Sequence, residues 1–213
     1  MEKIKTLINA PEVCVCIIDE QPQMFFGVQS TDRQTIMNNV VGLAKAAKVF
    51  NIPIVLSTVE SESFSGYIYS KLQDVYPIYA PIERTTLNSC EDKNFKQAVE
   101  KTGKKKLVIA GLWTEVCVTL PTISAIAEGY DVIIVTDASG GATKEAHDMA
   151  ILRMVQAGAV PVTWQALMLE WQRDWARKDT YNAVTAVIKE HGGAYGMGIE
   201  YATTMLPPSA TSS

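Results

Sequence analysis

The sequence predicts an α/β protein in which a mostly parallel six-stranded sheet lies between two layers of helices, with further helices at the C-terminal end. Short apolar runs alternate with longer amphipathic stretches along most of the chain, which is typical of repeated strand–helix units. Several of these runs are apolar without alternation, as in strands buried on both faces. The chain has 213 residues, 47% of them hydrophobic, which is enough for one sizeable core. We therefore predict a three-layer α/β/α, Rossmann-like arrangement with right-handed crossovers.

Six strands are predicted from apolar runs and from the turn residues that bound them. The first is a continuous apolar run that ends in Asp19, as expected of a central strand buried on both faces. The last is short and follows a helix closed by Gly158. In chain order, the strands are predicted at residues 13–19, 54–58, 78–81, 107–110, 130–137 and 160–163.

The helices between the strands are predicted from capping residues and from apolar residues at helical spacing. The first opens at Thr31-Asp32, which are good capping residues, whereas the stretch at 60–66 is polar and Ser-rich and predicts a loop. The helix that begins near Cys117 is expected to turn four residues toward the core: Leu120, Ile123, Ile126 and Ala127. In chain order, the helices are predicted at residues 31–50, 67–75, 91–102, 117–128 and 144–156.

The C-terminal part has a different character. A Trp-rich stretch ending at Trp175 and residues 179–190 predict helices too apolar to remain in water, so they are expected to pack on the sheet or on another subunit. We predict a main domain at residues 1–175 and an oligomer-related helical extension and tail at 176–213. The tail from about Tyr201 is expected to be loose unless a partner holds it.

Composition and charge argue against several classes of function. The formal net charge is −4 and the basic residues are spread along the chain, so neither a nucleic acid nor a membrane is an expected partner. No signal peptide or spanning segment is recognised, so a cytoplasmic location is expected. With two histidines, His147 and His191, and no Cys-x-x-Cys motif, no metal site and no other cofactor are predicted. Four cysteines are too few and too scattered for a disulfide scaffold: Cys14, Cys16, Cys90 and Cys117.

Cys117 is the candidate nucleophile. It follows a strand at the predicted first turn of a helix, where backbone N–H groups and the helix dipole favour the thiolate. Asp19 could accept the thiol proton, Arg84 could hold the anion, and the backbone N–H groups of Trp113 and Cys117 could bind an oxyanion. Sites in parallel sheets lie at the carboxyl ends of the strands, where four candidate residues are predicted: Asp19, Arg84, Cys117 and Asp137.

Each of these residues also has a structural interpretation. A single cysteine at a helix start is more often structural than reactive, an aspartate that ends a strand usually caps a helix, and an arginine in a loop is usually solvated. Cys14 and Cys16, which would share one face of a strand, are interpreted as core residues. The candidates carry more weight together than singly.

The chain resembles the isochorismatase-like cysteine hydrolases over residues 13 to about 175. The hydrophobic-Asp-x-Gln motif of this family is matched by Ile18-Asp19-Glu20-Gln21, and its Gly-x-x-Thr-x-x-Cys-Val motif by residues 111–118. Residues 129–138 fit the strand that follows. The YcaC-like subgroup of hydrolases shares further segments: residues 110–111, 114–118 and 135–139, and a Trp-rich helix that ends here at 173–175.

The resemblance implies a catalytic triad of Asp, Lys and Cys, which falls by position on Asp19, Arg84 and Cys117. Most of the superfamily has lysine where Arg84 stands, although the YcaC-like subgroup shares the arginine. An arginine keeps its proton, so proton transfer would fall to Asp19 alone. The resemblance also implies a cis peptide bond between Leu112 and Trp113, beside the oxyanion donors.

A substrate pocket is predicted from four residues near these motifs: Gln21, Phe25, Phe26 and Thr114. Phe25, Phe26 and Trp113 could equally be core or subunit-interface aromatics. Nicotinamidases of the superfamily hold a metal with histidines after the second strand, and segment 60–66 has none, so nicotinamidase activity is not expected.

The function predicted from these residues is that of a cysteine hydrolase that cleaves a C–N bond of the amide type in a small molecule, through a thioester on Cys117. Two alternatives remain open. One is a binding or scaffold oligomer whose chemistry has weakened, motivated by Arg84, and the other is a thiol-redox or electrophile-scavenging protein. Because the YcaC-like relatives pair two rings of four subunits, a homo-octamer is expected.

Overall fold

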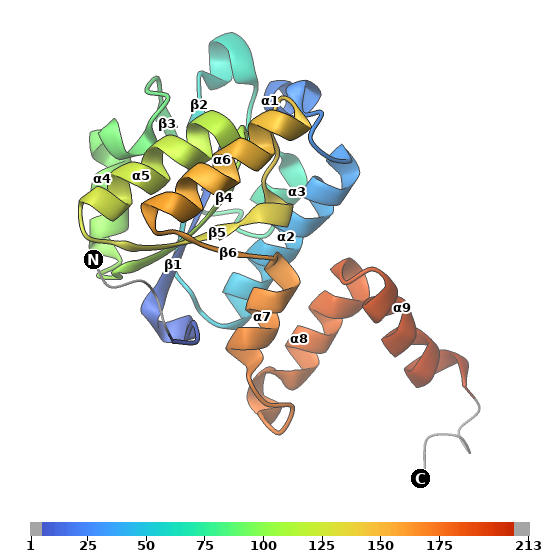
Figure 1. Ribbon diagram of the computed structural model, residues 1–213. Helices are drawn as coiled ribbons and strands as arrows, with labels where there is room; N and C mark the ends of the chain where they lie inside the picture. Colours follow the sequence, from blue (N-terminus) through green and yellow to red (C-terminus); the bar gives the residue numbers. More distant parts are fainter. Residues whose placement is uncertain (1–5, 207–213) are drawn as a thin grey trace.

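A computed structural model describes residues 6–206 and confirms the three-layer α/β architecture (Figure 1). The middle layer is a six-stranded sheet with the order β3-β2-β1-β4-β5-β6, and every neighbouring pair of strands is parallel. The strands are β1 (Val13–Ile18), β2 (Ile54–Val59), β3 (Ile82–Arg84), β4 (Lys106–Gly111), β5 (Asp131–Val135) and β6 (Val160–Val162).

The strand order reverses between β1 and β4. These two strands are paired along their whole length, so Ile18 at the end of β1 lies opposite Gly111 at the end of β4. The crevice outside the carboxyl ends of such a pair is where open α/β sheets bind ligands. Asp19 and the segment that carries Cys117 leave the sheet at this point.

Helices cover both faces of the sheet, as Figure 1 shows. Helices α2, α7 and α8 share one cluster of buried apolar residues with one face, and α1, α4, α5 and α6 share a second cluster with the other. The longer helices are α2 (Arg33–Val49), α4 (Lys93–Lys101), α5 (Thr119–Ala127), α6 (Lys144–Ala157), α7 (Trp164–Gln172) and α8 (Lys178–His191). The short ones are α1 (Pro22–Gly27), α3 (Ser70–Gln73) and α9 (Ala194–Glu200).

Two local predictions are wrong on the β3 side of the sheet. The third strand is Ile82–Arg84 and not 78–81, and Ile78 is 90% exposed. Apolar composition suggested a strand there, but backbone pairing with β2 begins only at Ile82. The predicted loop at 60–66 contains the one-turn π-helix η2 (Ser61–Ser65). Arg84 therefore belongs to a strand and not to a loop.

The predicted core face of α5 is also wrong. A one-turn π-helix, η4 (Thr114–Val118), precedes α5 and carries Cys117, so the α-helix begins only at Thr119. The wider π-turn changes which side of the following helix meets the sheet. Of the four residues expected in the core only Ile126 is buried, and the rest of the buried face is formed by others: Thr119, Pro121, Thr122 and Ala125.

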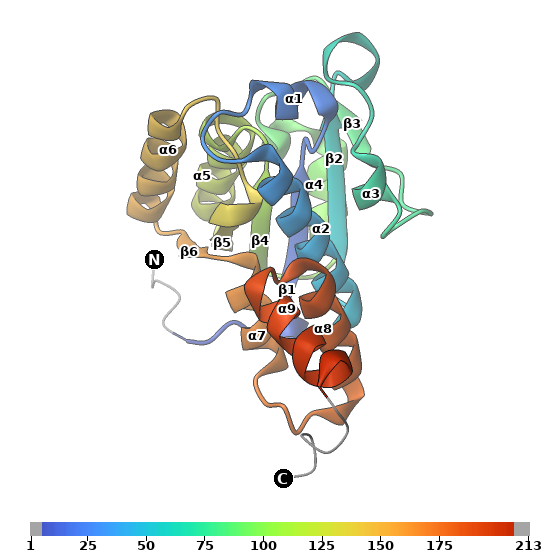
Figure 2. The same cartoon turned by 90° about the vertical axis from the view of Figure 1, so that its right-hand side faces the viewer.

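The C-terminal helices pack within the chain. Helices α7 and α8 lie against α2, and their residues Trp164, Trp171 and Ile188 belong to the same buried cluster as the sheet. Figure 2 shows α8 and α9 in front of α7 and the lower part of α2. Helix α9, which was not predicted, leaves Met197 74% exposed. The predicted tail continues as η6 (Tyr201–Met205), and its part from residue 207 lies outside the described residues.

No helix within residues 6–206 is both long and apolar enough to span a membrane.

Candidate active site

Asp19 is the first residue after β1 and is fully buried. Its backbone takes a left-handed conformation with φ 58°, which is uncommon for a residue other than glycine and occurs at sites where the surroundings enforce it. The Asp19 N–H donates to the Ser57 carbonyl at 3.0 Å, and the Gln21 N–H donates back to the Asp19 carbonyl at 2.8 Å. These bonds turn the chain sharply at the end of the strand.

Gln21 is fully buried and holds this turn to β2. Its side-chain amide donates to the Val59 carbonyl at 3.1 Å and accepts from the Val59 N–H at 2.9 Å. A further bond runs to the Gly66 carbonyl at 2.6 Å. Since both ends of the amide are bonded to backbone, Gln21 positions the chain around Asp19, and a contact with substrate stays a prediction.

Cys117 reaches the same region from β4. Gly111 ends that strand with φ 157°, and a Cβ there would lie 2.2 Å from the Ile18 carbonyl oxygen, so only glycine allows the close approach of β1 and β4. The peptide bond between Leu112 and Trp113 is cis, as predicted. The π-turn η4 then places the Cys117 side chain in the interior, 1% exposed.

Arg84 completes the group from β3. It lies opposite Val59 in the sheet and is buried. Its Nη2 donates to Asp19 Oδ2 at 2.5 Å, and its Nη1 donates to the Thr86 carbonyl. Within the described residues, Arg84 Nε and Asp19 Oδ1 have no hydrogen-bond partner. The structure thus brings the three predicted catalytic residues together and leaves one donor and one acceptor among them unused.

Burial dominates the protonation of this group. It raises the pKa of Asp19 to about 6, against the opposing pull of the Arg84 charge. Burial, followed by the neighbouring Asp19 charge, raises the pKa of Cys117 to about 12. The prediction that the helix start would favour a thiolate is therefore wrong, because desolvation outweighs the local backbone dipoles. These pKa shifts favour a neutral thiol at Cys117 beside Asp19.

Glu20 is a feature that the sequence did not reveal. It is fully buried, neither of its carboxyl oxygens has a hydrogen-bond partner in the described chain, and burial raises its pKa well above the ordinary value. Glu20 stands at the variable position of the hydrophobic-Asp-x-Gln motif, so only its burial in the structure identifies it as unusual. This end of the sheet buries three ionisable residues: Asp19, Glu20 and Arg84. Burying such groups costs free energy unless they are paired, and groups of this kind are often found at functional sites.

The other predicted pocket residues differ in their surroundings. Phe25 is buried and packs edge-to-face on Tyr69, with ring centroids 5.9 Å apart. Phe26 is 69% exposed, so within this chain it faces solvent and not a pocket. Thr114 is fully buried, and its hydroxyl lies 2.8 Å from Nδ1 of His147. Of these residues, Phe25 remains a candidate for a pocket wall.

Trp113 is seated against α1. Its Nε1–H donates to the Met24 carbonyl at 2.7 Å. A Cβ at Gly27 would come within 2.4 Å of the indole ring, so this glycine makes room for the ring. The contact fixes the residue that precedes the Cys117 turn.

Asp137 does not join the group, although it lies at the carboxyl end of β5 as predicted. Its Oδ1 accepts from the Trp164 N–H at 2.8 Å, and its carbonyl accepts from the Asn39 side chain at 2.8 Å. It therefore caps α7 and ties it to α2. Among the described residues, no three His, Cys, Asp or Glu side chains are grouped so that they could hold a metal ion.

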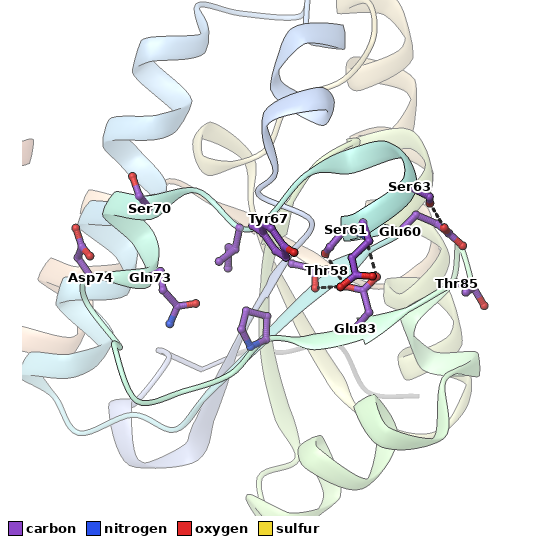
Figure 3. Close-up of a pocket in the computed structure, with 13 residues that line it drawn as sticks. Thr58, Glu60, Ser61, Ser63, Tyr67, Ser70, Gln73, Asp74, Glu83 and Thr85 are labelled. Carbon is purple, nitrogen blue, oxygen red and sulfur yellow. Dashed lines mark hydrogen bonds between the residues drawn. The ribbon is translucent and has the colours of Figure 1, made fainter.

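A cavity of about 800 Å³ is lined by residues on and after β2 and β3 (Figure 3). Alternate residues of a strand point to opposite faces, so Arg84 points toward Asp19 while Glu83 and Thr85 line the cavity. Glu83 accepts from Ser61 N–H at 2.9 Å and from the Thr58 hydroxyl at 2.8 Å, as Figure 3 shows. The cavity is thus separate from Cys117.

A parallel six-stranded sheet with helices on both faces and a buried polar group at the reversal of its strand order define the chain as a doubly wound α/β protein. The family model of the isochorismatase domain matches residues 13–166. The chain belongs to the isochorismatase family and is an isochorismatase-like hydrolase.

The relatives support this assignment. A probable hydrolase of Escherichia coli, YcaC, is 37% identical over 176 residues, which cover 82% of this chain and 85% of that protein. YcaC of Pseudomonas aeruginosa, solved with hexane-2,5-diol and covalent acrylamide, has a TM-score of 0.90 at 33% identity over 95% of this chain and all of that one. The E. coli YcaC structure, described as an octameric hydrolase of unknown specificity, has the same TM-score and identity over 96% of this chain and all of that one.

Proposed function

We propose that this protein is a cysteine hydrolase that cleaves a C–N bond of the amide type in a small molecule through a thioester on Cys117. The observation that carries the proposal is the convergence of Cys117, Asp19 and Arg84 in one buried group drawn from three strand ends. A thiol beside a carboxylate with a pKa near neutrality is the arrangement that general-base activation of a nucleophile requires.

The reaction begins with proton transfer from the Cys117 thiol to Asp19, whose Oδ1 is free to accept within the described chain. The sulfur then attacks the carbonyl carbon, and the backbone N–H groups of Trp113 and Cys117 stabilise the oxyanion. Asp19 returns the proton to the amine nitrogen as the C–N bond breaks. A water molecule then gives a proton to Asp19 and its oxygen to the thioester carbon. The C–S bond breaks, the carboxylic acid leaves, and Asp19 returns the proton to the sulfur, which restores the thiol and the Asp19 carboxylate.

Arg84 holds Asp19 in place and keeps its positive charge throughout. It stabilises the developing thiolate but does not carry a proton, so all proton transfer in the proposed reaction passes through Asp19. Hydrogen bonds at Nη1 and Nη2 fix the plane of the Arg84 guanidinium group. The direction of its Nε–H, which has no partner within the described residues, is therefore fixed as well. Arg84 supplies charge and Asp19 transfers protons because an arginine stands where most of the superfamily has lysine.

The proposed assembly is a homo-octamer. The described octamer is that of E. coli YcaC, with which this chain shares its fold over nearly its whole length. Exposed apolar side chains on α9 and η6, Met197 and Met205, would be covered in such an assembly. We retain the division into a hydrolase domain at 1–175 and a C-terminal extension at 176–213 as part of this proposal. Sedimentation or light scattering of the intact protein tests it, and a monomer would contradict it.

The decisive test of the chemistry uses intact-mass spectrometry. Acrylamide is a suitable first probe, since it reacts with thiols and is found covalently bound in P. aeruginosa YcaC. We expect one adduct that is lost in Cys117→Ala and kept in Cys90→Ala, a matched control because Cys90 is the other cysteine outside β1. Acid-quenched mixtures with a panel of small amides should then give acyl adducts on Cys117. Labelling that maps to Cys90 would contradict the proposal.

A second candidate is a binding or scaffold oligomer with weakened chemistry. This candidate is favoured because the group around Cys117 is closed to solvent. Cys117 is 1% exposed, and burial raises the pKa of its thiol. Arg84→Lys distinguishes the two: a large gain in amide hydrolysis favours the weakened site, whereas an unchanged or lower rate favours the working hydrolase. The raised pKa of Cys117 weighs against a thiol-redox role, which needs an accessible thiolate.

A further inference from the structure

The turn that carries Cys117 is held from one side by the segment that joins β5 to α6. The Thr114 N–H donates to the Gly140 carbonyl at 2.9 Å. The carboxylate of Glu115 accepts from the Ala142 N–H at 2.9 Å. The first two residues of η4 are therefore bonded to a stretch about 30 residues further along the chain, so the position of Cys117 depends on that stretch.

His147 extends this attachment into a helix. It lies in the first turn of α6, and its Nδ1 is 2.8 Å from the Thr114 hydroxyl. Thr114 is fully buried, and its carbonyl accepts from the Thr119 hydroxyl at 2.6 Å. The N–H, carbonyl and hydroxyl of Thr114 are all bonded, and the hydroxyl bond is the one that reaches α6.

Burial of His147 favours a neutral ring. Burial lowers the pKa of His147, Asp148 and Glu115 oppose this effect, and Lys144 adds to it. A neutral imidazole has one nitrogen that donates and one that accepts. With the proton on Nε2, the ring accepts the Thr114 hydroxyl proton at Nδ1. The hydroxyl then has one fixed direction.

We propose that His147 is a positioning residue for Cys117, acting through the Thr114 hydroxyl to hold the turn Thr114–Val118 in place. His147 makes no contact with the reacting atoms in this scheme. Without it, the Thr114 hydroxyl is free to bond a backbone carbonyl of its own turn, as threonines in helices do. The turn would then hold the sulfur and the oxyanion donors less well. The inference rests on the proposed function, since it assigns a role in placing the proposed nucleophile.

The test is a double-mutant cycle read out by the second-order rate of acrylamide labelling at Cys117. The variants are His147→Ala, Thr114→Val and the two combined, each checked for folding by circular dichroism and thermal unfolding. Misplacing a reacting group by about 1 Å slows a reaction by roughly 100-fold, so we expect His147→Ala and Thr114→Val each to slow labelling by about 10- to 100-fold. The double variant should be no slower than the slower single variant, because both changes break the same bond.

Two conservative changes separate positioning from general damage. His147→Asn keeps an acceptor close to the place of Nδ1, and Thr114→Ser keeps the hydroxyl, so both should label within about 3-fold of the unmodified chain. His191→Ala is the matched histidine control. That ring bonds Asn38 at 3.0 Å, at the end of α8, and its loss should not change the rate.

The labelling rates distinguish a failure of the role of His147 from a failure of the proposed function. Labelling of His147→Ala within 2-fold of the unmodified chain, or effects that add in the double variant, would overturn the role of His147 while leaving the hydrolase proposal intact. If His147→Ala does not fold, Thr114→Val against Thr114→Ser decides, and equal rates overturn the inference. An unmodified chain that shows no labelling at Cys117 would overturn the proposed function and this inference together.

Discussion

The two faces of β3 place similar carboxylates in opposite environments. On one face, Asp19 is fully buried with Arg84, and burial raises the pKa of Asp19 to about 6. On the other face, Glu83 lies at an open cavity of about 800 Å³. Burial pushes the pKa of Glu83 upward, but hydrogen bonds from Ser61 and Thr58 bring it below the ordinary value. A carboxylate with solvent and hydrogen-bond donors stays an anion, whereas a desolvated one can exchange a proton near neutral pH.

This difference argues against placing the proposed chemistry in the cavity of about 800 Å³. Its carboxylates, Glu60, Glu62, Asp74 and Glu83, make it strongly acidic, and the cavity holds no cysteine, lysine or arginine among its lining residues. The group around Cys117 is buried and combines a thiol, a carboxylate and a cation. Perturbed protonation and mutual geometry identify a site better than volume does.

The largest expected effect comes from removing the cation on the closed face. Arg84→Met leaves Asp19 buried without its partner, and breaking a buried ion pair in this way typically costs about 3–5 kcal/mol. Urea unfolding at pH 7.5 measures the change. Glu83→Gln, one residue away on the open face, is the matched control. Equal losses in the two variants would mean that the two faces of β3 do not differ as described.

Asp19 should give stability a pH dependence of known sign. Its pKa is about 6 in the folded chain against an ordinary value of 3.8, so the folded state binds the proton more tightly than the unfolded state. The resulting stability is fully present below about pH 4 and is lost as the pH rises through about 6, a total of about 3 kcal/mol. Urea unfolding of the unmodified chain and of Asp19→Asn between pH 4 and 7.5 measures it. A stability difference between the two chains that does not change with pH would refute the assignment.

The buried carboxyl of Glu20 should also make the stability fall as the pH rises. Substituting Glu20 should have a smaller effect. Glu20→Gln keeps the shape of the side chain but removes the need to hold a carboxyl protonated in a dry environment. We expect a gain in stability of roughly 1–3 kcal/mol at pH 8 that disappears toward pH 4. Thermal unfolding at the two pH values gives the comparison. A loss of stability at pH 8 would show that the Glu20 carboxyl has a favourable role in the fold.

The smallest effect is expected on the open face. Glu83→Gln should lower stability by about 1 kcal/mol or less, because the side chain is largely exposed and its bonds are replaced by water. Acrylamide labelling of Cys117 should stay within about 3-fold. A larger drop in labelling would show that the two faces of β3 are coupled and would remove the separation on which the comparison rests.

Much of the architecture could be predicted because periodicity and capping are local. β1, α2, β4, α6 and α8 were found at or near their residues, since a doubly buried strand and a capped amphipathic helix each leave a short-range pattern. The strand at 78–81 failed because a three-residue edge strand is defined by its pairing with β2 and not by its own composition. Helix α9 was not predicted, and glycine, which has a low helix propensity, stands at two of its positions.

The triad could be predicted in part. Motif and strand ends together led to Asp19, Arg84 and Cys117, which the fold brings together. Phe26 is predicted as a pocket residue but faces solvent, and the sequence of a six-residue helix is too short to reveal which side it buries. His147 and Glu20 left no usable signal, because the first depends on a contact across 33 residues of chain and the second on burial.

By itself, the sequence determined the order of strands and helices, the membership of the family and the choice of Cys117 as the candidate nucleophile, since each follows from local pattern or from a short motif. The tertiary structure alone decided the protonation of the site and its surroundings. Burial keeps Cys117 a thiol beside Asp19 and separates it from the acidic cavity across β3. The physical reason is that desolvation depends on how much of the whole fold surrounds a group, and no local stretch of residues contains that information.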